Sequence, residues 1–264
     1  KIIVPAAQKE EDLEVTVEAE ANQYIPFALD EVNLDFQILG PAPNNPDEVE
    51  ILIAASRKEK VEDRVAIAEA AGLRPRVMDV ESYATQEAFR LITPSLPANG
   101  RDQNIALVDV GAHITHFYVL RNGQFLFSRD QAFGGNQLTH DIQRAFNLSP
   151  EEAESAKKNQ GLPENYDADV LQPFMETLAL EITRALQFFF TSTAYNQVDQ
   201  IVLAGGCAQL PGLDELVAKR AGVATVIANP FASMQVSDRI RPRQLAQDAP
   251  MLTIAAGLAM RGFE

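Results

Sequence analysis

The segment best equipped for chemistry holds an aspartate, Asp109, near the end of an apolar run, with Gly111 two residues later. A buried carboxylate without a partner is costly, so such a residue normally has one. A carboxylate at the carboxyl end of a strand can accept a hydrogen bond from a water of hydrated Mg²⁺, an ion that keeps much of its water shell. The adjacent glycine lets backbone N–H groups approach an anion. The pattern predicts a metal and phosphate site, and an aspartate that bonds its own turn is the alternative.

Two pairs of adjacent glycines could also lie against a ligand. Gly134 and Gly135 precede a predicted helix, and Gly205 and Gly206 follow the apolar run "IVLA". Without side chains at such positions, a flat ring or a phosphate can lie against the backbone. The sequence has neither the P-loop pattern GxxxxGK[ST] nor the GxGxxG fingerprint of dinucleotide-binding folds. A plain tight connection between strand and helix is the alternative for both pairs.

Two helical patterns add weaker candidates. Glu154 and Lys157 lie at i and i+3, on one face of a predicted helix. Their carboxylate could accept from ribose hydroxyls and their ammonium could lie beside a base, although a solvated surface pair is the alternative. In the last predicted helix, the small residues Ala256 and Gly257 indicate close packing against another element.

No residue is assigned a catalytic role. The three histidines and one cysteine have no zinc-site spacing, and no Ser–His–Asp or Cys–His pattern is present. His113 is the only histidine that we expect beside a candidate site. Cys207 follows two glycines at a strand end, and we expect it to be a small buried residue.

Composition excludes several classes of protein. With 264 residues and 46% hydrophobic residues, the chain can form a substantial core. A net charge of −15 repels phosphate backbones, and no basic stripe offsets it, so we expect no nucleic-acid partner. No apolar run approaches the roughly 18 residues of a membrane span, and no signal peptide is visible. The single cysteine fits a reducing compartment. The chain begins at Lys1, in what reads as the middle of a strand, and we expect a fragment or processed product.

Hydrophobic periodicity predicts alternating strands and helices. We expect strands over residues 2–4, 32–38, 49–56, 74–80, 105–110, 114–120, 124–129, 200–206 and 224–230. We expect helices over residues 10–25, 57–71, 79–91, 136–146, 150–160, 170–193, 211–221 and 249–260. Residues 40–48 read as a turn-rich loop, and part of 10–25 could also be a strand. Asn122-Gly123 predicts a two-residue hairpin. Residues 93–102, rich in proline and glycine, are the expected domain boundary.

The order of these motifs resembles that of the actin-like ATPases, whose nucleotide lies between two related lobes. A strand–DxG–strand meander, a glycine pair before a helix, an AExxK helix, a strand ending in AGG and a C-terminal helix of small residues follow one another. The stretches "EANQYIPFALDEVNLDFQILG", "VDVGAHITHFYVL", "AFGGNQLTHDI" and "VLAGGCAQLPGL" are similar to the FtsA family and, more closely, to the PilM family of type IV pilus assembly. The resemblance covers nearly the whole chain.

The resemblance implies an α/β fold of the actin-like class, with ribonuclease H-like βββαβα lobes and an inserted subdomain of the FtsA/PilM type. It divides the chain as follows: residues 1–73 form the inserted subdomain (1C-like); 74–100 part of the first lobe (1A-like) and a linker; 101–149 and 198–248 the second lobe (2A-like); 150–197 a helical subdomain (2B-like); and 249–264 a return helix to the first lobe.

The resemblance also assigns roles to the candidate residues. It implies that the second phosphate loop is Asp109, Gly111, Ala112 and His113, with Asp109 facing a water bound to Mg²⁺. It places Gly134 and Gly135 in the first connection between lobes, and Ala256 and Gly257 in the second. It assigns Glu154 and Lys157 to the ribose and adenine, and Gly205 and Gly206 to the adenosine.

Two departures from the family pattern limit these roles. The FtsA loop reads DxGGGT, whereas Ala112 and His113 replace glycines here and the threonine follows one place later, at Thr115. The extra Cβ atoms restrict how closely a phosphate can approach the backbone. The first phosphate loop of the family lies upstream of Lys1, so its aspartate is not in this chain, and we expect the chain to bind nucleotide weakly or not at all.

The resemblance implies a cytoplasmic scaffold of the type IV pilus assembly platform that binds ATP and Mg²⁺. Its expected partner is the short N-terminal cytoplasmic tail of the inner-membrane protein PilN, held in a groove between the inserted subdomain and the adjoining lobe. Other pilus motor or platform proteins are further candidate partners. Association with the membrane would then be indirect, and any ATPase activity weak. Two alternatives stay open: an actin-fold small-molecule kinase, and a pure interaction module with a vestigial nucleotide pocket.

Overall fold

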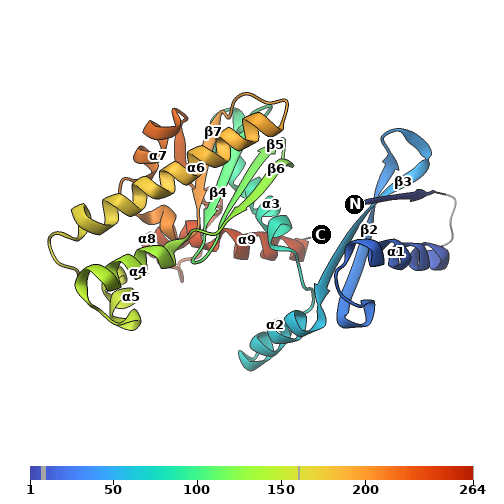
Figure 1. Cartoon of the computed structure of the whole chain (residues 1–264), viewed down its shortest axis with the longest axis horizontal. Helices are drawn as coiled ribbons and strands as arrows, with labels where there is room; N and C mark the ends of the chain where they lie inside the picture. Colours follow the sequence, from blue (N-terminus) through green and yellow to red (C-terminus); the bar gives the residue numbers. More distant parts are fainter. Residues whose placement is uncertain (7–9, 160, 264) are drawn as a thin grey trace. The chain divides into compact units, whose positions relative to one another are not determined.

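The computed structural model describes residues 1–6, 10–159 and 161–263. The chain forms two compact units, Lys1–Val80 and Glu81–Glu264, which Figure 1 colours from blue to cyan and from cyan-green to red. The division falls between Val80 and Glu81, upstream of the boundary that we expected at residues 93–102. That segment instead forms short 3₁₀ turns in the second unit, where Leu96 is buried in a core.

The first unit is a three-stranded antiparallel sheet with a helix packed on it. Its strands β1 (Ile2–Pro5), β2 (Val32–Ala42) and β3 (Asn45–Arg57) are arranged in the order β1-β3-β2. Helix α1 (Glu10–Tyr24) contributes Leu13 and Val17 to a core that also contains Ile51 of β3. A strand would place Val15 on the same face as these two residues, but Val15 is 67% exposed, so the open alternative is settled in favour of a helix. Helix α2 (Lys58–Ala70) follows β3 and ends before Gly72, which has a positive φ of 75°.

Two predictions for the first unit are wrong. Residues 40–48, expected as a loop, belong largely to β2 and β3, with a register shift between Ile38 and Gly40. The sheet accommodates Pro41 because β2 is an edge strand, where a residue without an N–H is tolerated. Residues 74–80, expected as a strand, form none. Val77 is 62% exposed and pairs with no strand among the described residues, and an apolar run without a neighbouring strand gains no ladder of hydrogen bonds.

The second unit is built on a five-stranded mixed sheet. Its strands are β4 (Ile105–Val110), β5 (Thr115–Arg121), β6 (Gln124–Gln131), β7 (Gln200–Ala204) and β8 (Thr225–Ile227), in the order β6-β5-β4-β7-β8. The first three form the predicted antiparallel meander, and β7 and β8 run parallel to β4. Asn122 and Gly123 have the positive φ angles, 51° and 76°, that the predicted hairpin requires.

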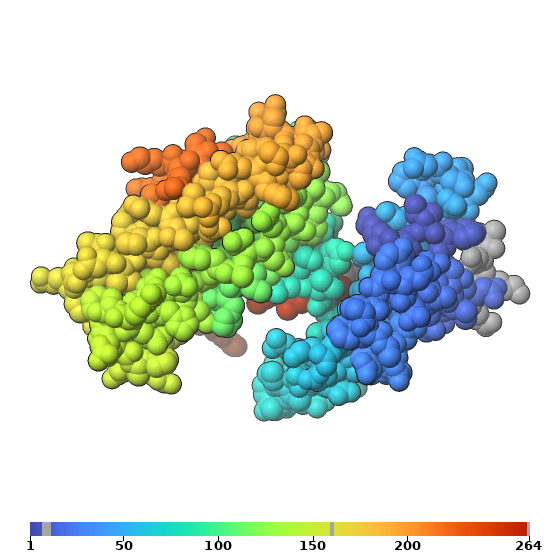
Figure 2. All heavy atoms as spheres, viewed as in Figure 1, coloured from blue at the N-terminus to red at the C-terminus, as the bar shows by residue number. Residues whose placement is uncertain are grey.

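Helices cover both faces of this sheet (Figure 1). One face packs on α4 (Gly135–Phe146), α6 (Gln172–Ser192) and α7 (Leu213–Ala221), and the other on α3 (Glu81–Ile92). The whole of β4 is therefore buried, with Ala106 and Val108 facing α6, and Ile105 and Leu107 facing α3. Figure 2 shows α6 running diagonally across one side of the unit. Its buried residues, among them Phe174, Leu178 and Ile182, recur at helical spacing along one face.

Three further helices complete the second unit. Helix α5 (Pro150–Asn159) follows α4, and its predicted end at Gln160 lies outside the described residues. Helix α8 (Pro242–Asp248) was not predicted. Helix α9 (Thr253–Met260) follows a 3₁₀ turn at Ala249–Leu252 and packs on α3. Within the described residues, no helix is long and apolar enough to cross a membrane.

Candidate functional site

Asp109 lies near the carboxyl end of β4, past the apolar residues that anchor the strand. Its side chain is buried, with 6% exposed. In the sheet it pairs with His116 of β5 on one side and with Ala204 of β7 on the other. Among the described residues, no group donates a hydrogen bond to its carboxylate. Burial raises the pKa of Asp109 to about 6; the nearby His116 opposes the rise and Glu81 adds to it. A buried acid without a donor in the protein is the arrangement expected of a residue that binds a cation or a water.

Gly205 brings the second diglycine into contact with this acid. A Cβ built on Gly205 would lie 2.5 Å from Oδ1 of Asp109 and 2.4 Å from the carbonyl oxygen of Val110. The residue also has a φ of +83°, and its N–H donates to the carbonyl of Pro250 at 2.9 Å. Both the space and the backbone conformation thus require glycine at this position. By contrast, a Cβ on Gly206 would meet only Sδ of Met251, at 3.9 Å.

The loop after Asp109 rests on the amino end of α4. The N–H of Gly135 donates to the carbonyl of Gly111 at 2.9 Å, and the N–H of Asn136 donates to that of Ala112 at 2.8 Å. A Cβ on Gly134 would lie 2.5 Å from the Gly111 oxygen, so this approach depends on a residue without a side chain. The first amides of α4 are therefore used by the loop.

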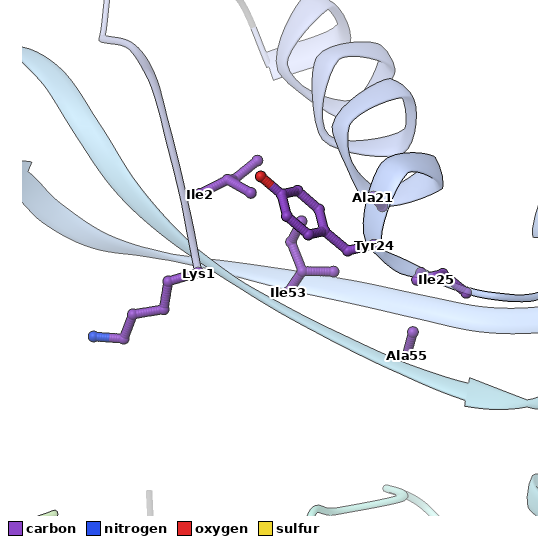
Figure 3. Close-up of a pocket in the computed structure, with 7 residues that line it drawn as sticks. All are labelled: Lys1, Ile2, Ala21, Tyr24, Ile25, Ile53 and Ala55. Atoms are coloured by element: carbon purple, nitrogen blue, oxygen red, sulfur yellow. The ribbon is translucent and has the colours of Figure 1, made fainter. Parts of the chain in front are cut away.

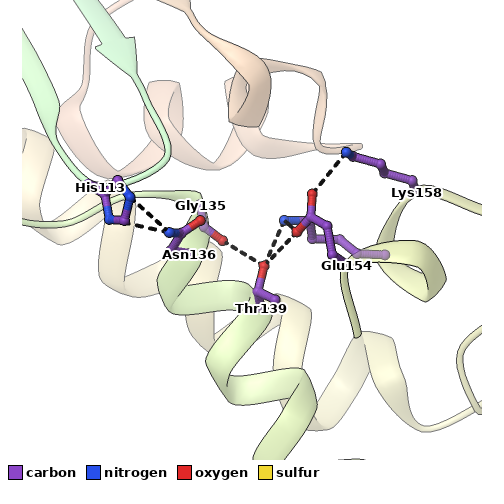
Figure 4. A network of polar contacts seen from close by, with 7 residues as sticks. His113, Gly135, Asn136, Thr139, Glu154 and Lys158 are labelled. Carbon is purple, nitrogen blue, oxygen red and sulfur yellow. Dashed lines mark hydrogen bonds and ion pairs between the residues drawn. The ribbon is translucent and has the colours of Figure 1, made fainter. Parts of the chain in front are cut away.

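His113 is an exposed residue of this loop. The Asn136 side-chain nitrogen, Nδ2, lies 3.3 Å from both ring nitrogens of His113, as Figure 4 shows. Within the described part of the chain, the backbone N–H groups of Ala112 and His113 have no acceptor. The loop therefore offers two adjacent free donors close to the buried acid.

Glu154 and Lys157 form a network with a residue that was not predicted, Thr139 of α4. Figure 4 shows Thr139 beside Glu154. Nζ of Lys157 lies 2.6 Å from Oε2 of Glu154, and Nζ of Lys158 lies 3.1 Å from Oε1. The Thr139 hydroxyl donates to Oε2 of Glu154 at 2.9 Å and accepts from Lys157 at 2.8 Å. The bond from Lys157, above all, lowers the pKa of Glu154 to about 2. Glu154 is therefore ionised and can only accept hydrogen bonds.

Cys207 links this network to the diglycine that precedes it. A Cβ on Gly135 would lie 2.9 Å from its Sγ atom. Burial raises the pKa of Cys207 to about 11, an effect that Lys157 opposes and Glu154 strengthens. The thiol is thus protonated at neutral pH and is a poor nucleophile, as expected of a small buried residue. It also shows that the strand end, the start of α4 and the Glu154 network lie close together.

Ala256 and Gly257 are not part of this group. They lie in α9, and a Cβ on Gly257 would stand 1.7 Å from the carbonyl oxygen of Ala84 in α3. The structure confirms the close packing that their small size indicated, and shows it as a contact between helices. The turn before α9 approaches the site through the bond from Gly205 to Pro250.

His116 and Thr139 are the main residues that sequence reasoning missed. His113 was expected to be the only histidine near the site, but His116 is the direct neighbour of Asp109 in the sheet. Its Nδ1 lies 2.8 Å from Oδ1 of Asp130, and its Nε2 lies 3.5 Å from Oε1 of Glu81. The carboxylates of Asp130 and Glu81 thus flank the imidazole of His116, which itself lies next to Asp109. No group of three or more His, Cys, Asp or Glu side chains among the described residues could hold a metal ion directly.

Comparisons with known proteins identify the family of this chain. A family model described as "Type IV pilus assembly protein PilM" matches residues 1–263. A solved structure, the "PilM-PilN type IV pilus biogenesis complex", has 32% sequence identity and a TM-score of 0.77, and the match covers 100% of this chain and 75% of that chain. The match therefore extends over both compact units.

Two EutJ proteins are similar to part of this chain. The ethanolamine utilization protein EutJ of Escherichia coli (strain K12) is 28% identical over 117 residues, 44% of this chain and 38% of that protein. The crystal structure of EutJ from Carboxydothermus hydrogenoformans has a TM-score of 0.55 at 20% identity, over 78% of this chain and 62% of that one, and thus shows a shared fold. The predicted actin-like α/β fold is confirmed. Because the family model matches residues 1–263 and the solved complex matches the whole chain, this chain belongs to the PilM family of type IV pilus assembly proteins.

Proposed function

We propose that this chain is a nucleotide-binding scaffold of the type IV pilus assembly platform, which binds MgATP at the site around Asp109 and the N-terminal cytoplasmic tail of PilN at its first unit. The observation that carries the nucleotide part is the contact between Oδ1 of Asp109 and Gly205. It joins a buried acid and a diglycine from different strands. In this proposal the protein is cytoplasmic, peripheral to the inner membrane through PilN, and residues 1–73 are the inserted subdomain.

The residues at the site suit Mg²⁺ bound through water. Asp109 is a buried acid without a donor, and Mg²⁺ usually keeps several waters and takes only one or two carboxylates from a protein. Asp109 would accept from such a water, and the nearby cation would hold its carboxyl group ionised despite the raised pKa. When bound, the ion neutralises charge on the phosphates.

The remaining groups suit the other parts of ATP. The free N–H groups of Ala112 and His113 would donate to a phosphate, since the amides of α4 are already used. Gly206 presents open backbone against which the adenosine would lie, and Gly205 lets that backbone pass close to Asp109. Glu154 would accept from the ribose, with Lys157 beside the base. Titration of MgATP into the chain and into Asp109→Asn tests this part of the proposal.

The first unit contains a pocket that suits the apolar part of an extended peptide. Its volume is about 210 Å³, and Figure 3 shows its wall between α1 and β3. Seven residues line it: Lys1, Ile2, Ala21, Tyr24, Ile25, Ile53 and Ala55. Support for PilN as the occupant comes from the solved PilM–PilN complex, which this chain matches over its whole length.

Filling this pocket is expected to weaken binding of the PilN tail. In Ala55→Phe the new ring would occupy space that a side chain of the tail needs, and we expect affinity to fall about tenfold, the effect of losing one buried apolar contact. Ala54→Phe is the matched control, because neighbouring strand residues point to opposite faces of a sheet. Fluorescence anisotropy of a labelled PilN-tail peptide measures both. Equal affinities for the two variants would remove the pocket from the proposal.

A further inference from the structure

We propose that Thr139 positions Glu154 so that the site selects ribonucleotides over 2′-deoxyribonucleotides. This inference rests on the proposed binding of ATP and names the part of the nucleotide that the α4–α5 network reads. It assigns to Thr139 a positioning role that neither its sequence pattern nor the resemblance indicated.

Thr139 holds the network from a buried position. It lies on α4, one turn after Gly135, with 8% of its surface exposed. Its hydroxyl has two possible acceptors, the Glu154 carboxylate at 2.9 Å and the carbonyl of Gly135 at 3.4 Å. A hydroxyl has one proton, and the shorter bond to a charged acceptor is the stronger, so the proton points to Glu154. The lone pairs of the same oxygen accept from Lys157.

The donors around Glu154 leave its carboxylate about one free lone-pair site for a further hydrogen bond. Thr139 and Lys157 donate to its Oε2 atom, and Lys158 approaches its Oε1 atom. An ionised carboxylate has about four lone-pair sites, so about one remains. The Glu154 side chain is 39% exposed, and a ligand can therefore reach it. Without the Thr139 bond, the flexible Glu154 would be held only by two lysines of its own helix, which move with it.

The chemistry of this remaining site favours a sugar hydroxyl. A negatively charged group that can only accept repels a phosphate and binds a hydrogen-bond donor. The ribose of a nucleotide supplies two such donors, and a 2′-deoxyribose lacks one of them. The network also lies at the right place, because α4 begins at the phosphate loop and Cys207 connects it to the diglycine. A ribose would lie between those two parts of the site.

The simpler interpretation is that Thr139 only ties α4 to α5. In that case, loss of the Thr139 hydroxyl would weaken the binding of every nucleotide to the same extent, or would lower only the stability of the protein. The ratio of affinities for ATP and 2′-deoxy-ATP separates the two interpretations, because a general loss of structure does not change it.

The test is isothermal titration of ATP and of 2′-deoxy-ATP, each with Mg²⁺, into the chain, Thr139→Val and Thr139→Ser. We expect the unmodified chain to bind ATP about tenfold more tightly, the value of a hydrogen bond to a charged group. Thr139→Val keeps the shape but removes the hydroxyl, and the ratio should fall to near one, mainly through weaker ATP binding. Thr139→Ser keeps the hydroxyl and should keep the ratio. Thr183→Val is the control, since Thr183 makes a comparable bond to the carbonyl of Ala179 in α6.

Three results would overturn the inference while leaving nucleotide binding intact. They are equal affinities of the unmodified chain for the two nucleotides, an unchanged ratio in Thr139→Val, and a lost ratio in Thr139→Ser. The first needs no variant, so it stands even if Thr139→Val does not fold. Absence of binding for both nucleotides would instead reject the proposed function itself, and this inference with it.

Discussion

Replacement of Gly205 by alanine is expected to abolish nucleotide binding and to destabilise the second unit. Its φ of +83° with a ψ of 174° belongs to a region that essentially only glycine adopts, at a cost of about 1–3 kcal/mol for other residues. The new Cβ would also stand 2.4 Å from the Val110 carbonyl and 2.5 Å from Oδ1 of Asp109. Those neighbours are a backbone and a buried carboxylate, and they cannot move without disturbing β4. We expect the free energy of unfolding to fall by about 3 kcal/mol or more.

Gly206→Ala is the matched control for that variant. The new Cβ would contact only Sδ of Met251, at 3.9 Å, and the φ of Gly206 is not in the positive range. Urea denaturation measures the stability of both variants, and titration of MgATP measures their binding. The proposed convergence of β4 and β7 requires a large difference between them. Equal stabilities would show that the strand end at Gly205 is more open than the structure indicates.

Gly257→Ala is expected to disrupt the contact between α9 and α3. A Cβ there would stand 1.7 Å from the Ala84 oxygen and 2.5 Å from the Ala84 carbonyl carbon. The two helix backbones would have to separate, and the buried residues Ala84 of α3 and Ala256 of α9 would lose packing. We expect a loss of about 3–5 kcal/mol. This loss outweighs the gain of about 1 kcal/mol that alanine gives over glycine inside a helix.

Thermal denaturation followed by circular dichroism tests the Gly257 prediction. Gly262→Ala serves as the control, because a Cβ at Gly262 meets nothing within 4 Å. A melting temperature of Gly257→Ala within a degree or two of the control would contradict the observed helix contact. Since α9 reaches the site through the turn at Pro250, we also expect weaker MgATP binding in Gly257→Ala.

Sequence reasoning succeeded where the relevant signal is local. The apolar run before Asp109 indicated a buried strand, and Asn122-Gly123 indicated the hairpin that reverses it. The i, i+4 spacing of Leu13 and Val17 could not decide between helix and strand in α1, because either element places them on one face; only the exposure of Val15 between them, 67%, decides for a helix. Each of these features depends on residues close together in the chain.

The failures concern pairings between distant segments. His116 is next to Asp109 only because of the register between β4 and β5, and Glu81 approaches His116 from the start of a helix. No pattern within either segment fixes that register. Likewise, residues 74–80 have the composition of a strand but no neighbouring strand among the described residues to pair with. Thr139 could have been found, because it lies four residues after Gly135 on the face that leads into the predicted site.

The resemblance to a family brought together candidates that were weak one by one. Asp109, Gly205 and Glu154 come from segments separated by many residues, and no spacing rule connects them. The structure places these three near the start of α4, and it leaves Gly257 in a separate helix contact. The order of motifs along the chain therefore carried information that no single motif contained.

The central claim is that Asp109 and the diglycine at Gly205 form one MgATP site. Its most direct test is titration of ATP, with Mg²⁺ and with excess EDTA, into the chain and into Asp109→Asn, with the exposed Asp238→Asn as the charge-matched control. The account predicts that Mg²⁺ strengthens binding to the chain and to the control, and that Asp109→Asn binds at least about tenfold more weakly, without response to Mg²⁺. Stability should not fall, because the amide removes a buried charge. Equal affinity and equal Mg²⁺ response in Asp109→Asn would contradict the account, and no binding to any form would favour a pure interaction module.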